Sequence, residues 1–306
     1  MDRTRDLRCA SISEDVGEDM PGTAPEANGW VAIEQRGPYG RDALRESHFP
    51  SAVGTWLKET LAPLAIKPLL IRPAGAHPDI NKEPTSRRVF VASSIPGASA
   101  LATFNIRHPD ELYDVDFSAI TSGRIAAAYS GVQIEHDPLL LICSHAKRDI
   151  CCAQRGRPIA KELSRRLGLQ GKPHRIWESS HVGGHRFAPV GLQLPHGWVH
   201  GRFDLDRAAA IFVDAQVGRV AMSSVRGRSS LDPLAQIAEI AARQLTDVMA
   251  IDSVNATALG GNRFQITSSA GEGIELEVSE NYAAGPRPEA CAKAPTPWHI
   301  HSIRQV

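Results

Sequence analysis

Two cysteines and two histidines between positions 143 and 185 offer the donor atoms that soft and borderline metal ions prefer. They are Cys143, Cys152, His181 and His185. Cys143 ends a predicted strand, Cys152 precedes a predicted helix, and the histidines bracket two glycines just after the next predicted strand. Because neighbouring parallel strands in a β-α-β unit end side by side, we expect the four side chains to converge. Glycines at 183 and 184 would allow positive φ there and bring both imidazoles to one face.

Two thiolates and two imidazoles suit either tetrahedral zinc or an iron–sulfur cluster in which histidines replace two cysteines. Structural zinc sites usually draw their sulfurs from a tight C-x(2–4)-C knuckle, and the eight residues between Cys143 and Cys152 exceed that spacing. The spacing therefore favours an iron–sulfur cluster and excludes neither metal. A third interpretation is a thiol redox enzyme that uses Cys143, Cys151 or Cys152, although the chain lacks the usual C-x-x-C.

The elements that must position these residues repeat an order that occurs about 100 residues earlier in the chain. Each series runs strand, helix, strand, strand, strand by hydrophobic periodicity. The first series is 30–33, 51–61, 67–71, 88–92 and 98–106; the second is 139–143, 157–167, 174–178, 187–194 and 198–203. Pro158 is placed near the start of its helix, where proline is tolerated. A further helix is expected after each unit, more clearly at 205–217. We predict an α/β fold of tandem βαβββ units, the second of which carries the site.

The residues that follow the second series predict a small α+β appendix. It begins with an amphipathic helix over 231–248 that Asp232 caps. Strands are expected at 254–259, 264–267, 274–278 and 298–303. The first residues are acidic and rich in turn formers, which predicts a flexible or loosely docked lead-in. The predicted organisation is a lead-in over 1–28, an N-terminal unit without a cluster over 29–130, a cluster domain over 131–220 and the appendix over 228–306.

Composition limits the classes of function. The 306 residues contain 34 Lys plus Arg and 34 Asp plus Glu, which argues against a globally basic nucleic-acid binder. No window supplies the apolar run that a membrane helix needs, and the N-terminal residues are too charged for a secretory signal. Five cysteines, an odd number, suit a reducing compartment, so we expect a cytoplasmic protein. Cys9 and Cys291 are expected to be unliganded thiols.

Several strings of residues resemble the sucrase/ferredoxin-like family over roughly residues 9 to 205. They are Cys-Ser-His-Ala-Lys-Arg-Asp-Ile-Cys-Cys-Ala (143–153), Arg-Gly-Arg-Pro (155–158), Trp-Glu-Ser-Ser-His-Val-Gly-Gly-His-Arg-Phe-Ala (177–188), Gly-Thr-Ala-Pro (22–25), Trp30 and Glu-Gln-Arg-Gly-Pro (34–38). The resemblance implies a thioredoxin-like ferredoxin whose [2Fe-2S] cluster is bound through C-x8-C and H-x3-H. Its ligands here would be Cys143, Cys152, His181 and His185. Cys151 departs from the family pattern, so an exchange between Cys151 and Cys152 is conceivable. Nothing supports glycoside chemistry, since no carboxylate pair stands out.

Such a cluster would have an unusual charge. Two ferric ions, two sulfides and two thiolates sum to zero when both histidines are neutral, whereas four thiolates would leave two negative charges. Histidine ligation should therefore raise the potential from about −400 mV, typical of all-cysteine ferredoxins, toward roughly −150 to +300 mV. Reduction should also favour protonation of the outer imidazole nitrogens. The expected protein is a one-electron carrier or redox sensor of pH-dependent potential rather than a catalyst.

Basic residues gather around the site. Residues 139–186 contain ten Lys or Arg against three acids in a chain that is neutral overall. The basic face over 147–186 predicts an acidic redox partner protein. Nucleic acid is disfavoured because no aromatic residues interleave with the charges, and no membrane partner is expected.

Overall fold

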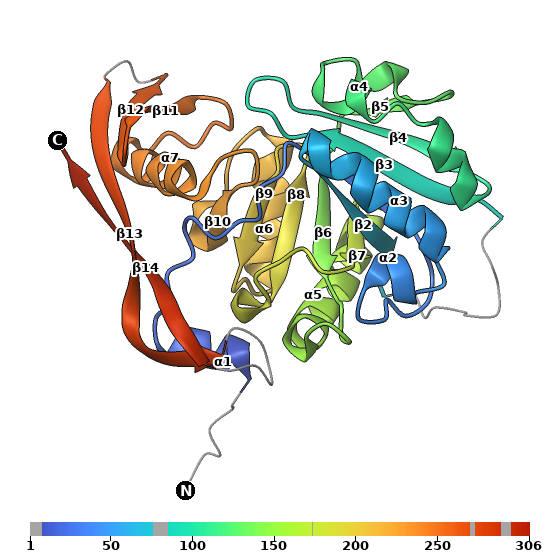
Figure 1. Ribbon diagram of the computed structural model, residues 1–306, viewed down its shortest axis with the longest axis horizontal. Coiled ribbons are helices and arrows are strands. Elements are labelled where there is room, and N and C mark those ends of the chain that lie inside the picture. The colour runs from blue at the N-terminus through green and yellow to red at the C-terminus, as the bar shows by residue number, and fades with distance from the viewer. Residues whose placement is uncertain (1–7, 76–84, 173, 270–272, 289–294) are drawn as a thin grey trace, which may run out of the picture.

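The computed structural model (Figure 1) describes residues 8–75, 85–172, 174–269, 273–288 and 295–306, and only the backbone of 280, 282–288 and 295–299. These residues form a mixed α/β structure with one ten-stranded mixed sheet and one four-stranded antiparallel sheet. The predicted α/β class is confirmed at this level. Among the helices described, none combines the length and apolar composition that a bilayer span requires. Cys291 lies outside the described residues.

The large sheet has the strand order β10-β9-β8-β6-β7-β2-β1-β3-β4-β5. Its strands are β1 (Gly29–Glu34), β2 (Ile66–Pro73), β3 (Arg87–Ser93), β4 (Ala100–Ile106), β5 (Gln133–Glu135), β6 (Leu139–Cys143), β7 (Ile176–Ser179), β8 (Val190–Leu194), β9 (Trp198–Gly201) and β10 (Val225–Arg228). The α-helices of this part are α1 (Cys9–Asp15), α2 (Ala43–Glu46), α3 (Ser51–Leu61), α4 (Ser118–Thr121), α5 (Ile150–Leu169) and α6 (Leu205–Gln216), with short 3-10 turns between them.

Strand pairing follows the same pattern in both halves of the sheet. β1 pairs in parallel with β2 and antiparallel with β3, which pairs with β4. β6 pairs in parallel with β7 and antiparallel with β8, which pairs with β9 across the turn at 195–197. The halves join where β2 pairs antiparallel with β7. All the strands that the sequence predicts in 29–203 are present, within a few residues at their ends.

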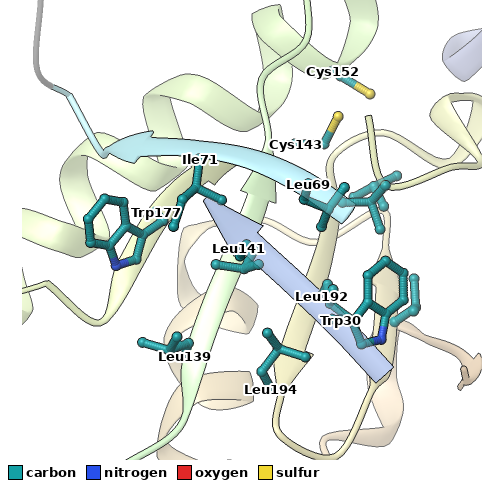
Figure 2. Close-up of a cluster of buried hydrophobic side chains, with 14 of the residues drawn as sticks. Trp30, Leu69, Ile71, Leu139, Leu141, Cys143, Cys152, Trp177, Leu192 and Leu194 are labelled. Atoms are coloured by element: carbon teal, nitrogen blue, oxygen red, sulfur yellow. The ribbon is translucent and has the colours of Figure 1, made fainter. Parts of the chain in front are cut away.

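The largest hydrophobic cluster lies between strands of the two halves. Its strand members include Trp30, Leu69, Leu141 and Leu192, and its helical members come from α1 and from the first turn of α5. Figure 2 shows side chains of both halves gathered in one layer that extends to Cys143 and Cys152. Separate clusters join the first half to α3 and the second half to α5 and α6. Cys143 and Cys152 therefore lie at one end of this largest hydrophobic cluster.

Helix α5 begins earlier than the sequence predicts. It starts at Ile150, and Asp149 caps it by accepting a hydrogen bond from the Cys151 amide at 2.8 Å. Pro158 lies within the helix instead of at its start. Proline removes one intrahelical hydrogen bond, to the carbonyl of Gln154, and the twenty-residue helix is stabilised by packing on both sides of that point. Cys151 and Cys152 consequently belong to the first turn of α5.

The N-terminal segment is packed against the body of the protein over its described part, residues 8–28. The side chains of Cys9, Ser13 and Glu18 are all but fully buried. Composition suggested a loosely docked lead-in because large apolar residues are few, but small residues and buried hydrogen bonds hold this segment. Glu18 accepts from Ser13 Oγ at 2.6 Å and from Arg186 Nε at 2.9 Å. Strands β5 and β10 were also not predicted, since both are short.

The C-terminal unit packs one helix on the four-stranded antiparallel sheet. α7 (Pro233–Thr246) is capped by Asp232, as predicted, and covers the strands with an apolar face. The strands, in sheet order, are β11 (Val254–Gly260), β12 (Arg263–Ser268), β13 (Ile274–Pro288) and β14 (Pro295–Gln305). The long β13–β14 ribbon reaches α1 (Figure 1), and the His301 amide donates to Asp19 Oδ2 at 2.9 Å.

Candidate metal centre

Cys143, Cys152 and His181 form one compact group. Their ligand atoms all lie within 4.8 Å of one another, and both thiols are buried. Cys143 ends β6 and pairs with Ser179 at the end of the parallel strand β7, two residues before His181. The predicted convergence of adjacent strand ends is thus observed for these three residues. In Figure 2 the two sulfurs lie close together at one end of the buried layer.

A glycine lets α5 approach β6 closely enough to form this group. A Cβ atom at Gly156 would lie 2.4 Å from the carbonyl oxygen of Cys143, which no side chain tolerates. The capped first turn therefore rests directly on the end of β6, and Cys152 faces Cys143. Position 156 consequently requires glycine, because α5 and β6 lie so close together there.

A hydrogen bond between the two thiols shifts their pKa values in opposite directions. The hydrogen bond from Cys152, together with the imidazole of His181, holds the pKa of Cys143 well below that of an ordinary thiol, although burial opposes this shift. The same hydrogen bond, with burial, raises the pKa of Cys152. The Cys143 thiol therefore loses its proton more readily than an ordinary thiol, and a bound cation would lower the pKa of Cys152 as well.

His145 positions the backbone of His181. It is buried, its Nε2 donates to the Gly40 carbonyl at 2.7 Å, and its Nδ1 accepts from the His181 amide at 3.1 Å. Both ring nitrogens are thereby engaged within the protein. Burial lowers the pKa of His145 and keeps the ring neutral, as this tautomer requires. His145 acts as a support for the group.

His185 lies beside the three-residue group without belonging to it. Its ring centroid is 5.3 Å from that of His181, and its Nε2 is 3.7 Å from Oδ2 of Asp149. Burial opposes ionisation of Asp149, but the Cys151 amide and the neighbouring His185 hold the pKa of this carboxyl below its usual value. Asp149 is thus an anionic partner for His185, and the sequence analysis did not identify it as a site residue.

Cys151 points away from Cys143. Its sulfur lies 3.7 Å from that of Cys9, and Cys9, Asp149 and Cys151 form a second buried group. The hydrogen bond with Cys9 lowers the pKa of Cys151 to about 7, against the effect of burial. The arrangement favours Cys152 over Cys151 beside Cys143. Cys9, which was expected to be an unliganded thiol, begins α1 and contacts Cys151.

The histidine loop adopts the conformation that its glycines were expected to provide. Gly183 and Gly184 have φ of 112° and 70°, a region that residues with a side chain rarely enter. The guanidinium of Arg226 in β10 holds this loop and donates to the Gly183 carbonyl at 2.9 Å. Arg226 is buried, and burial lowers its pKa to about 9. Sequence reasoning missed Arg226, since nothing in its flanking residues marks it as buried.

Much of the basic face is neutralised by ion pairs within the chain. Arginines that pair with carboxylates are Arg155, Arg157, Arg165, Arg166, Arg175 and Arg186. Lys147 and Arg148 are exposed and adjoin the candidate site. Arg148, Arg41 and Lys58 line a cavity of about 200 Å³ onto which His145 and His181 also open. Asp42 also lines this cavity and pairs with Lys58 at 2.5 Å, so Arg41 and Arg148 carry the net positive charge beside His181.

The fold and site define a mixed α/β protein with a buried cysteine–histidine group of metal-binding composition. The chain belongs to the sucrase/ferredoxin-like family, whose model matches residues 20–227. The family expected from the motifs is confirmed. No curated protein and no solved structure matches the chain.

Proposed function

We propose that this chain binds a [2Fe-2S] cluster through Cys143, Cys152, His181 and His185 and serves in one-electron transfer or redox sensing. The observation that carries the proposal is the grouping of two buried thiols with the His181 ring within 4.8 Å, in a member of a ferredoxin-like family. A second histidine ring stands next to that group at 5.3 Å. When bound, such a cluster would supply a one-electron acceptor.

The donor set fits this group. Within the described part of the chain, the buried Nδ1 atom of His181 has no hydrogen-bond partner, and the ring supplies one ligand atom to the group. The Cys143 thiol is poised to lose its proton. Buried apolar neighbours, among them Val182 and Phe187, keep water from the thiols. A buried pocket lined by apolar side chains, with one readily ionised thiol, suits a metal centre of low net charge.

The surrounding charges favour a potential above that of all-cysteine ferredoxins. Arg226 places a buried cation close enough to Cys152 to affect its electrostatics, and a cation stabilises the more negative, reduced state. Asp149 faces Nε2 of His185 and favours a proton on that nitrogen. Electron uptake would then draw a proton to His185, and the midpoint potential would fall as pH rises.

Analysis of anaerobically purified protein tests the proposal. We expect two irons and two sulfides per chain, visible absorption that bleaches on reduction, and a pH-dependent midpoint above about −150 mV. A colourless protein with one zinc ion would instead support a structural zinc module. A pH-independent midpoint near about −400 mV would contradict histidine ligation.

Replacing one histidine separates cluster binding from histidine ligation. His181→Cys should retain the cluster, lower the midpoint toward about −400 mV and weaken its pH dependence, because a charged thiolate replaces a neutral ring. His136→Ala removes an exposed histidine and is the matched control, with no expected change. An unchanged potential in His181→Cys would remove His181 from the ligand set.

We further propose that the two halves of the large sheet are thioredoxin-like units related by duplication, the second of which holds the cluster. The support is the shared pairing pattern, in which a parallel pair is extended by two antiparallel strands in each half. The first half has neither cysteine nor a histidine pair at the corresponding strand ends, β1 and β2. It would act as a structural partner.

For docking we propose an acidic redox protein that binds over Lys147 and Arg148, close to His181. Lys147, Arg148 and Arg41 are exposed, and Arg148 and Arg41 line the cavity onto which His181 opens. Lys147→Glu with Arg148→Glu should slow reduction by an acidic donor such as a plant-type ferredoxin at low salt, and the difference should vanish at high salt. Equal rates at low salt would exclude this face.

A further inference from the structure

A second pair of thiols lies next to the candidate metal centre and is separate from it. The sulfurs of Cys9 and Cys151 are 3.7 Å apart, and Cys9 Sγ donates to Asp149 Oδ2 at 3.4 Å. Both cysteines are buried. Cys151 and Cys152 are adjacent on a helix, so their side chains diverge by about 100°. Cys152 accordingly faces Cys143, while Cys151 faces the N-terminal segment.

The N-terminal helix that carries Cys9 is attached to the start of α5 through side chains. Arg155 donates to Glu14 at 2.5 Å and to Ser11 Oγ at 2.8 Å. On its other side, Arg202 donates to the Ser13 and Glu18 carbonyls at 2.9 and 2.8 Å. α1 also contacts the short turn His185–Phe187, which includes the second candidate histidine ligand. The segment therefore covers the metal centre from the side of His185.

We infer that Cys9 and Cys151 are a disulfide-forming pair that ties the N-terminal segment to α5 over the candidate metal centre. A disulfide requires the sulfurs to approach to about 2.05 Å, a closure of about 1.7 Å. Rotation of the two side chains and a small displacement of α1 can supply it, because a short seven-residue helix moves more easily than a strand within a sheet. The pair joins residues 142 positions apart.

A small disulfide, such as glutathione disulfide, is the oxidant. The Cys151 thiolate attacks one of its sulfurs, which forms a mixed disulfide and releases one glutathione thiolate. The Cys9 thiol then gives up its proton to solvent and attacks the Cys151 sulfur, which releases the second glutathione. The protein loses two protons and two electrons, and the small disulfide gains them as two thiols.

The Cys9–Cys151 disulfide would restrain the N-terminal segment that covers the candidate metal centre. In the reduced protein, α1 can open by breaking its ion pairs and small apolar contacts. In the oxidised protein that opening also requires reduction of the disulfide. The disulfide pair itself does not depend on which metal the centre holds.

Mapping of disulfides in the full chain tests the inference. The protein carrying Cys291→Ser, which removes the remaining cysteine, is equilibrated anaerobically with glutathione and glutathione disulfide, acid-quenched, alkylated and digested. We expect the Cys9 and Cys151 peptides to be linked, with a mass two hydrogens below their sum. Oxidation should raise the urea midpoint and slow chelation of bound metal several-fold, in wild type and in Cys291→Ser alike. Cys9→Ser and Cys151→Ser should abolish both effects.

Three outcomes would overturn the inference. In the first, Cys9 and Cys151 are still recovered as alkylated thiols from mixtures that fully oxidise Cys291 of the wild-type chain to a mixed disulfide. In the second, Cys151 is linked to Cys143 or Cys152 instead. In the third, a zinc ion retained by wild type is lost in Cys9→Ser, which would show that the second thiol group binds metal. Peptide masses and zinc content can be measured whether or not the group of Cys143, Cys152 and His181 holds a cluster. These results are therefore distinguishable from failure of the cluster proposal.

Discussion

The guanidinium of Arg226 donates to the carbonyl oxygen of Gly183 at 2.9 Å and also contacts the backbone of Thr23. It therefore joins β10, the histidine loop and the N-terminal segment at one buried point. The side chain also stacks over the Phe187 ring, with 5.0 Å between guanidinium carbon and ring centroid. A residue outside the cysteine–histidine motifs thus fixes the loop between the two candidate histidine ligands.

Arg226→Met should destabilise the fold by about 3 kcal/mol, because two buried carbonyls lose a charged donor. Arg226→Lys should recover only part of this loss, since a lysine cannot reproduce the planar fork. Urea denaturation measures both. Arg207→Met, at an exposed position, is the control and should change stability by less than about 0.5 kcal/mol. Equal stabilities for wild type and Arg226→Met would refute the role of Arg226.

Gly184→Ala tests the close approach of the loop to Arg226. A Cβ atom at Gly184 would overlap the guanidinium, and φ of 70° already disfavours any side chain. Gly218→Ala is a matched control, because Gly218 has the same φ and no atom lies within 4 Å of the position that a Cβ would take there. We expect a loss of about 1 kcal/mol for the control, from φ alone. Gly184→Ala should lose more stability than this control. A loss of stability in Gly184→Ala no larger than in Gly218→Ala would show that the contact with Arg226 is easily relaxed.

Arg72→Met tests the seam between the halves of the sheet. Glu178 in β7 is fully buried and accepts from Arg72 Nε and Nη2 of β2 at 2.9 and 2.7 Å. Removing the cation leaves a poorly compensated buried carboxylate, so we expect a loss of about 3 to 5 kcal/mol in urea denaturation. Arg72→Met with Glu178→Leu should be more stable than Arg72→Met alone. The hypothesis fails if the double variant is the less stable of the two.

His200 should make stability depend on pH. Burial, followed by the charge of Arg226, lowers the pKa of His200 from 6.5 to about 3. Between these values the unfolded chain binds a proton that the folded chain does not, so stability is present above pH 6.5 and is lost as pH falls toward 3. Relative to His200→Gln, wild type should lose about 1.4 kcal/mol more per pH unit in that window. Parallel stability curves for wild type and His200→Gln would contradict this, and His136→Ala, at an exposed site, should follow wild type.

The sequence was sufficient for the elements that have strong local signals. Helical periodicity predicted α3 and α7 closely, a continuous apolar run predicted β6, and Asp232 marked a helix start, because apolar patterns and end capping are properties of neighbouring residues. The start of α5 was misplaced, since Pro158 is a stronger local signal than the single cap Asp149. The donor types at 143, 152, 181 and 185 were likewise evident from the chain alone.

Residue types and spacing thus determined which atoms are available for chemistry. Only the tertiary structure decided which of two adjacent cysteines faces Cys143, that Cys9 meets Cys151 across 142 positions, and that Arg226 holds the histidine loop. The physical reason is that these relationships depend on how β10 and the N-terminal segment pack against α5 and the sheet. Contacts between distant segments leave no periodic trace in the residues beside them.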